Sequence, residues 1–244
     1  TLSKLCFFKP TFEKAASIML KFAVTEPEYL PSGANGDFNR LFYPLLGATE
    51  TDLTTRAVFL SENVQVVEYR RQIIRALECT MRIEGVAYLS GAEVLGTRRL
   101  RHYSPKYPEE VEKYIANSLD FLDGLMADND AELGIILENH VTELCLHGFA
   151  DLVLPRLIKI AKTRVEPWES LLDTLILFKD KLAVSLSDEQ ENMYKELVSL
   201  LSKSDFAFRF RRIDSDVNKG DFRIPAEVKM QEVEKKYEAI AEEF

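Results

Sequence analysis

The sequence is poor in several features that mark well-known classes of protein. Cysteine occurs only three times, at Cys6, Cys79 and Cys145. This odd number at wide spacing fits neither a disulfide framework nor a zinc ribbon. Free thiols suggest a reducing compartment, so we expect a cytoplasmic protein. Ten glycines and nine prolines in 244 residues are too few for a low-complexity chain.

An excess of positive charge and long apolar runs are also lacking. The chain has 31 Lys and Arg residues against 40 Asp and Glu residues, which gives a net charge of −9. This balance argues against a general nucleic-acid or anionic-membrane binder, because both need a summed positive field. No apolar run approaches the ~18–20 residues that a membrane-spanning helix needs. We therefore expect no membrane partner.

The opening residues, TLSKLCFFKPTF, do not have the layout of a secretory signal peptide. The chain begins with Thr1 where an initiator methionine would stand. We expect it to be a fragment of a longer protein.

What the sequence does contain is a succession of segments with the apolar period of helices. Residues 108–163 hold three such segments, separated by short polar breaks at 127–130 and near Gly148. This pattern is typical of antiparallel helices packed side by side. A longer segment, 64–89, is expected to turn Val67, Ile74, Leu77, Met81 and Tyr88 inward.

Capping residues and helix breakers predict where several elements begin and end. Thr11 and Asp52 are expected helix caps, and Ser187 with Gln190 has the capping-box pattern. The breakers in 27–36, which include Asn35-Gly36, predict a loop. Pro167 is expected in the first turn of a further helix.

These segments predict an all-α protein of about ten helices, with no strand alternating with helix and thus no parallel sheet to hold a site. Helix–turn–helix units recur every ~35–45 residues, which favours an α-solenoid of stacked antiparallel helix pairs. A compact helical bundle is the alternative. We expect a helical-repeat domain over 1–213, then a linker and an amphipathic helix over 214–244. Residues 206–210 are expected to be an extended linker.

The densest group of metal-ligand residue types is His140, Glu143 and His147. Their i, i+3, i+7 spacing places all three along one helix face, and imidazoles with a carboxylate suit zinc or iron. A helical di-iron site needs more ligands from facing helices, and only His102 remains among the histidines. Packing is therefore the favoured interpretation, and a metal-dependent enzyme is the alternative.

Motifs for nucleophilic catalysis and nucleotide binding are missing from the sequence. It contains no glycine-flanked serine elbow and no phosphate-cradling G-x-x-x-x-G-K-[ST] loop. We therefore expect no cofactor and no catalytic residues in this chain.

The loop 96–108 is the strongest candidate for a binding site. Arginines interleaved with tyrosines can bind phosphate or nucleic acid by pairing and stacking, although pairing with the chain's own carboxylates is the simpler interpretation. A second basic group follows about a hundred residues later. The candidate partner-binding residues are Arg98, Arg99, Arg101, His102, Tyr103, Lys106, Arg209, Arg211 and Arg212.

Three segments together resemble a known family by residue type and spacing. They are TFEKAASIMLKFAVTEPEYLPSGANGDFNRLFYPLLGATE (11–50), RLRHYSPKYPEEVEKYIANSLDFLDGLMADND (99–130) and PWESLLDTLILFKDKLAVSLSDEQENMYKELVSLLSKSDFAFRFRRI (167–213). The arrangement is similar to the helical-repeat region (of the HEAT, armadillo and TPR type) that follows the ATPase core of large bacterial STAND-like NTPases. Several of those proteins act in antiviral defence. The chain departs from the pattern at 26–28 and 33–36.

The resemblance implies a scaffold or sensor role, with the nucleotide site outside these residues. The first hypothesis is accordingly a non-catalytic helical-repeat module that binds a protein partner or other domains of its parent chain. A metal-dependent helical enzyme is the second hypothesis. Nucleic-acid binding through the arginine loops is the third, ranked last because the net charge is negative.

Overall fold

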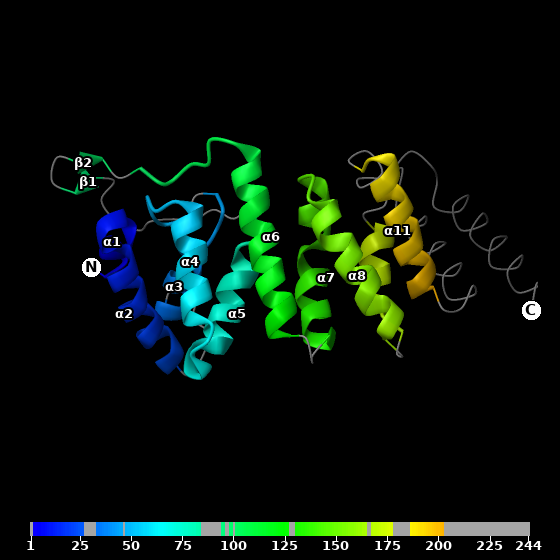
Figure 1. Cartoon of the computed structure of the whole chain (residues 1–244), viewed down its shortest axis with the longest axis horizontal. Helices are drawn as coiled ribbons and strands as arrows, with labels where there is room; N and C mark the ends of the chain where they lie inside the picture. The colour runs from blue at the N-terminus through cyan, green and yellow to red at the C-terminus, as the bar shows by residue number, and fades with distance from the viewer. Residues whose placement is uncertain are drawn as a thin grey trace, which may run out of the picture. The chain divides into compact units, whose positions relative to one another are not determined.

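The computed structural model is almost entirely helical, as the sequence predicts, with one very short pair of strands (Figure 1). It divides into two compact units, Thr1–Ile136 and Leu137–Phe244. The structure describes residues 2–26, 33–45, 47–83, 94–95, 98–99, 101–126, 130–164, 167–177 and 186–202.

The first unit contains six α-helices, two short 3-10 helices and the strand pair in the part that the structure describes. A seventh helix, α7 (Asp130–Leu146), begins in this unit and ends in the second. The other elements are α1 (Leu2–Phe7), η1 (Lys9–Thr11), α2 (Phe12–Thr25), α3 (Ala34–Arg40), α4 (Leu53–Asn63), η2 (Val67–Tyr69), α5 (Arg70–Cys79), β1 (Val94–Leu95), β2 (Arg98–Arg99) and α6 (Pro108–Leu125).

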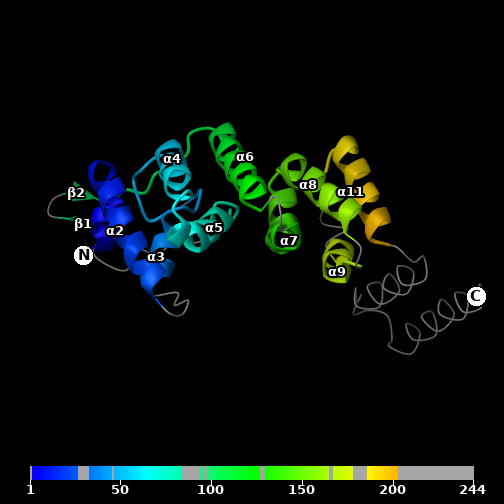
Figure 2. The ribbon, with the colours of Figure 1, turned by 60° about the horizontal axis from the view of Figure 1, so that its bottom comes forward.

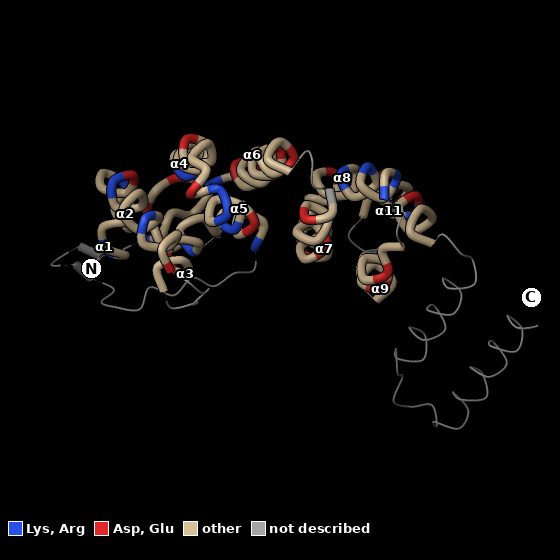
Figure 3. The backbone as a smooth tube through the Cα atoms, turned by 90° about the horizontal axis from the view of Figure 1, so that it is seen from below, with Lys and Arg blue, Asp and Glu red and all other residues tan. Residues whose placement is uncertain are grey.

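The helices of the first unit form two rows. Figures 2 and 3 show α2, α4 and α6 in one row and α3 and α5 in the other. Figure 1 shows that α4 and α6 run in the same direction, while α5 returns between them. Figure 3 also shows basic positions gathered on α5 and only acidic ones on α7.

Helix α2 confirms the predicted apolar face but not the predicted cap. Its core-facing residues are buried as expected. The Thr11 hydroxyl makes no capping bond; it donates instead to the carbonyl of Leu5 at 2.6 Å. The hydroxyl thus bonds to a carbonyl within α1 and leaves the first turn of α2 without a side-chain cap. The buried residues of the predicted face are Phe12, Ala15, Ala16, Met19 and Ala23.

The loop predicted over 27–36 is wrong in its last residues, because Asn35 and Gly36 lie inside α3. The carboxylate of Glu26 accepts hydrogen bonds from the backbone N–H groups of Ala34 (2.6 Å) and Asn35 (3.0 Å). It thereby satisfies donors that the first helical turn leaves without an intrahelical partner. The amide of Gln72 on α5 donates to the Asn39 side chain at 2.7 Å, which anchors α3 from within the core.

Helix α5 is much shorter than the predicted 64–89 segment. It runs from Arg70 to Cys79 after the 3-10 turn η2, and residues 84–89 lie outside the described residues. The inward assignment is wrong for Val67, which is 82% exposed. The buried positions Ile73, Ala76 and Leu77 follow the period of a helix that starts at Arg70.

A buried arginine organises the irregular segment between α3 and α4. Arg56 is fully buried on α4, whose start at Leu53 is capped by Asp52 as predicted. Its guanidinium donates from Nε to the carbonyl of Thr51 at 2.9 Å. From Nη1 it donates to the carbonyls of Leu41 at 3.1 Å and Tyr43 at 2.7 Å. One side chain therefore replaces the hydrogen bonds that secondary structure would give these carbonyls.

The second unit contains the end of α7 and three more described helices. Gly148 follows α7 with a φ of +85°, a left-handed conformation that ends helices and favours glycine. The capping box of Ser187 and Gln190 is confirmed. Pro167 precedes the next helix by two residues, so its predicted place in the first turn is wrong. These helices are α8 (Ala150–Thr163), α9 (Glu169–Leu177) and α11 (Asp188–Leu201).

Side chains bind these helices to one another within the second unit. The phenol of Tyr194 on α11 donates to the carbonyl of Leu175 on α9 at 2.9 Å. The indole of Trp168, only 3% exposed, donates to the carboxylate of Glu138 on α7 at 2.6 Å.

Several predictions concern parts of the chain outside the described residues. They are the extended linker at 206–210, the amphipathic helix within 214–244 and the domain boundary between 213 and 214. No helix in the described ranges combines the length and the apolar character that crossing a membrane requires.

Replacing Arg56 by methionine should destabilise the first unit and leave the second unchanged. Methionine fills similar space but donates nothing, so three buried carbonyls lose their donor. We expect the first unit to lose about 3 kcal/mol of stability. This loss raises the population of its locally unfolded state roughly a hundredfold. Hydrogen exchange followed by mass spectrometry should show faster exchange in peptides from 38–60.

The matched control is Arg71→Met, which removes an exposed arginine from α5. Equal exchange in the two variants would contradict the role assigned to Arg56.

Candidate functional site

The predicted basic loop is held against the first unit by hydrogen bonds and ring packing. We call residues 101–107, between β2 and α6, the strap. The ring Nδ1 of His102 lies 2.9 Å from the carbonyl oxygen of Gly47, and the ring packs edge-on against Phe7. The backbone N–H of Tyr103 donates to the carbonyl of Thr49 at 2.9 Å. The strap therefore holds the same segment that Arg56 stabilises from the inside.

The Tyr103 side chain connects the strap to both α4 and α6. Its hydroxyl donates to Oε2 of Glu110, and its ring lies 5.7 Å from the Arg56 guanidinium carbon. The other oxygen of Glu110 accepts from the backbone N–H of Lys106 at 3.3 Å. The hydrogen bond to Glu110, with some burial, raises the pKa of Tyr103 to about 12, because ionisation would place two negative charges together.

The other predicted partner-binding residues divide into three groups. Arg101 and Lys106 are exposed and form no ion pair with any residue that the structure describes. Arg98 and Arg99 form β2, which pairs antiparallel with β1. The second basic group lies outside the described residues; it consists of Arg209, Arg211 and Arg212.

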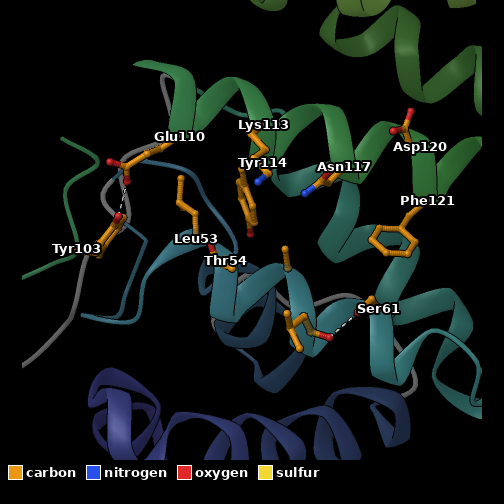
Figure 4. Close-up of a pocket in the computed structure, with 12 residues that line it drawn as sticks. Leu53, Thr54, Ser61, Tyr103, Glu110, Lys113, Tyr114, Asn117, Asp120 and Phe121 are labelled. Atoms are coloured by element: carbon orange, nitrogen blue, oxygen red, sulfur yellow. Dashed lines mark hydrogen bonds between the residues drawn. The ribbon is translucent and has the colours of Figure 1, made fainter. Parts of the chain in front are cut away.

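A groove begins at Tyr103 and runs between α4 and α6 (Figure 4). We call it the α4–α6 groove; its volume is about 610 Å³. Figure 4 shows Leu53 and Thr54 near the Tyr103 end and Ser61 and Phe121 at the other end. Its lining residues are Leu53, Thr54, Ala57, Val58 and Ser61 of α4, Tyr103 of the strap, and Glu110, Lys113, Tyr114, Asn117, Asp120 and Phe121 of α6.

The floor of the groove is apolar and rigidly held. Leu53 and Tyr114 are buried, and the Tyr114 hydroxyl donates to the carbonyl of Phe42 at 3.1 Å. Burial raises the pKa of Tyr114 above its ordinary value, so the phenol stays neutral. Val58 is 47% exposed and Phe121 is half-buried, so both present apolar surface to an occupant.

Two polar side chains of α6 point into the groove. Lys113 is exposed and Asn117 is half-buried; they are four residues apart and so share a helix face. Neither side chain has an ion pair or hydrogen bond with the described residues. Figure 4 shows both side chains on the side of α6 that faces α4, while Glu110 turns toward Tyr103. The groove thus combines an apolar floor with two hydrogen-bond donors available to a ligand.

Of the predicted histidine and carboxylate group, His140 and Glu143 lie on α7, whereas His147 follows its last residue, Leu146. His140 is buried, Glu143 is half-buried and His147 is exposed, so they face different surroundings. Among the described residues no three His, Cys, Asp or Glu side chains come together in a way that could hold a metal ion.

The three cysteines are buried in apolar surroundings. Burial raises the pKa of the Cys6, Cys79 and Cys145 thiols to about 12 in each case. A thiol is nucleophilic as the thiolate, so these residues pack as small apolar side chains at neutral pH.

Sequence reasoning located the strap but missed the groove beside it. Tyr103 is part of the strap and also lines the groove. In the sequence, Lys113, Asn117 and Phe121 look like ordinary residues of an amphipathic helix. The i, i+4 and i+8 spacing of these three residues gave a signal that they share one face. What the sequence could not show is that α4 lies next to that face.

Comparisons with protein-family models, with curated proteins and with solved structures found no match to this chain.

Replacing Tyr103 by phenylalanine should remove a late step from the alkaline titration of the tyrosines. The wild-type minus variant absorbance at 295 nm should rise near pH 12, since Tyr103 has its pKa raised to about 12. The hydrogen bond of the Tyr103 hydroxyl should stabilise the folded chain by about 1 kcal/mol below pH 10. This stabilisation should disappear as the pH rises from 10 to 12. A difference that rises near pH 10 would contradict the bond to Glu110.

The native protein should react slowly with a thiol reagent such as DTNB at pH 8. All three thiols should react quickly in denaturant, because unfolding restores their ordinary pKa and exposes them. Rapid modification of any one cysteine in the folded chain would show a reactive thiol that the structure does not predict.

Proposed function

We propose that this chain is a non-catalytic helical scaffold or sensor module that binds a protein partner through the α4–α6 groove and the adjoining strap. The observation that carries the proposal is the groove itself. It offers an apolar floor, exposed apolar side chains and polar groups available for bonding, which is the composition of protein–protein contact surfaces.

The length of the groove favours a macromolecular occupant. From Glu110 to Phe121 it follows α6 for eleven residues, or about 16 Å at the α-helical rise. A peptide element matches such an elongated surface between two helices. The net charge of −9 also favours protein over nucleic acid, because phosphates would meet a repulsive field.

The arrangement of helices in the first unit supports the solenoid architecture. Helices α2, α4 and α6 occupy one row and α3 and α5 the other (Figure 3), as in stacked helix pairs whose neighbours create extended binding surfaces. We extend the proposal to a helical-repeat region over 1–213 in a cytoplasmic protein. A larger STAND-like bacterial defence or signalling NTPase as the parent chain is part of the same proposal.

Photo-crosslinking tests the proposed surface directly. We would introduce p-benzoylphenylalanine at Val58 in the groove. The matched control is the same substitution at Val67, which is also exposed but lies on η2. We expect position 58 to cross-link a specific protein from the source organism, and that purified protein to lose at least about tenfold in affinity for Val58→Arg.

The corresponding variant Val67→Arg should bind the same partner normally. Cross-linking of the same proteins from both positions, or equal affinity for both arginine variants, would reject the groove as the binding surface.

A further inference from the structure

The α4–α6 groove also indicates what kind of element occupies it, an inference that rests on the proposed function. We propose that the groove takes an amphipathic helix of another protein, and that an acidic side chain of this helix is bound by Lys113 and Asn117.

The occupant is helical because of the geometry of the groove walls. Helices α4 and α6 run in the same direction on either side of the groove (Figures 1 and 4). A third helix can lie in the depression between two such helices, with its ridges packed between theirs at an interaxial distance of about 8–10 Å. The groove length of about 16 Å corresponds to three helical turns.

The occupant carries a carboxylate because of the two donors in the middle of the groove. The ammonium of Lys113 and the amide of Asn117 both line the groove from one face of α6 (Figure 4), without partners among the described residues. A carboxylate has two oxygens and can accept from both donors at once.

Two nearby carboxylates do not occupy the place of this ligand. Both oxygens of Glu110 accept hydrogen bonds from the strap, one from the Tyr103 hydroxyl and one from the Lys106 backbone. Figure 4 shows Asp120 pointing away from α4, at the opposite end from Tyr103. Lys113 is therefore the positive charge that faces the middle of the groove.

The position of the apolar surface sets the pattern of the occupant. Phe121 lies one helical turn beyond Asn117 on α6, and Val58 lines the same groove from α4, so apolar residues and the acidic residue of the partner should share one helix face about one to two turns apart. Leucines at i and i+4 with glutamate at i+7 lie on one face of a helix and meet this requirement.

Fluorescence polarisation with two designed peptides tests the inference on the whole chain. The first peptide has Leu-x-x-x-Leu-x-x-Glu within a helical alanine–glutamine background; the second is identical except for lysine in place of glutamate. We expect the glutamate peptide to bind about fivefold more tightly, since one charge contact changes from attraction to repulsion. Lys113→Glu should reverse this preference, and Lys159→Glu, a change at an exposed lysine of α8, should leave it unaltered.

Each other outcome has a definite meaning. Equal affinity for the two peptides, an unchanged preference in Lys113→Glu, or no binding of either peptide up to about 1 mM overturns the inference. If Val58→Arg abolishes binding of both peptides while their affinities are equal, the groove still binds helices and the proposed function survives. If Val58→Arg changes nothing, the peptides bind elsewhere and the groove loses its support for both proposals.

Discussion

A single buried cation, the guanidinium of Arg56, replaces secondary structure for the chain between α3 and α4. Taking such a charge out of water costs several kcal/mol. Hydrogen bonds to the carbonyls of Leu41, Tyr43 and Thr51 offset that cost, helped by the face of the Tyr103 ring. The three carbonyls come from a segment that would otherwise leave them without partners. Its path is therefore fixed by a side chain of the helix that follows it.

The groove depends on this arrangement through its two tyrosines. The Tyr114 hydroxyl donates to the carbonyl of Phe42, which neighbours a carbonyl that Arg56 binds. The backbone N–H of Tyr103 donates to the carbonyl of Thr49 in the same segment. Gly47 shows how closely these parts approach: a Cβ there would lie 2.5 Å from Nη1 of Arg56. The floor of the candidate site is consequently built from the same contacts that stabilise the irregular segment.

Local signals in the sequence predicted part of this fold. Helices α6, α7 and α8 were foreseen because their starts and ends depend on near neighbours, such as Pro108 and Gly148. Helix α3 was missed because the carboxylate that caps it belongs to Glu26, eight residues before Ala34. Residues 101–107 form an irregular loop, as predicted, but the groove arises from pairing α4 with α6, which no local pattern encodes.

The only tryptophan of the sequence lies in the second unit, so tryptophan fluorescence distinguishes that unit from the first. Trp168 is buried in the second unit, bonded to Glu138 and stacked beneath the Arg164 guanidinium carbon at 4.8 Å. The sequence contains no other tryptophan, so emission excited at 295 nm comes from one unit alone. The first unit contains no such fluorophore and is silent in that channel. The chain therefore carries its own reporter of the unfolding of the second unit.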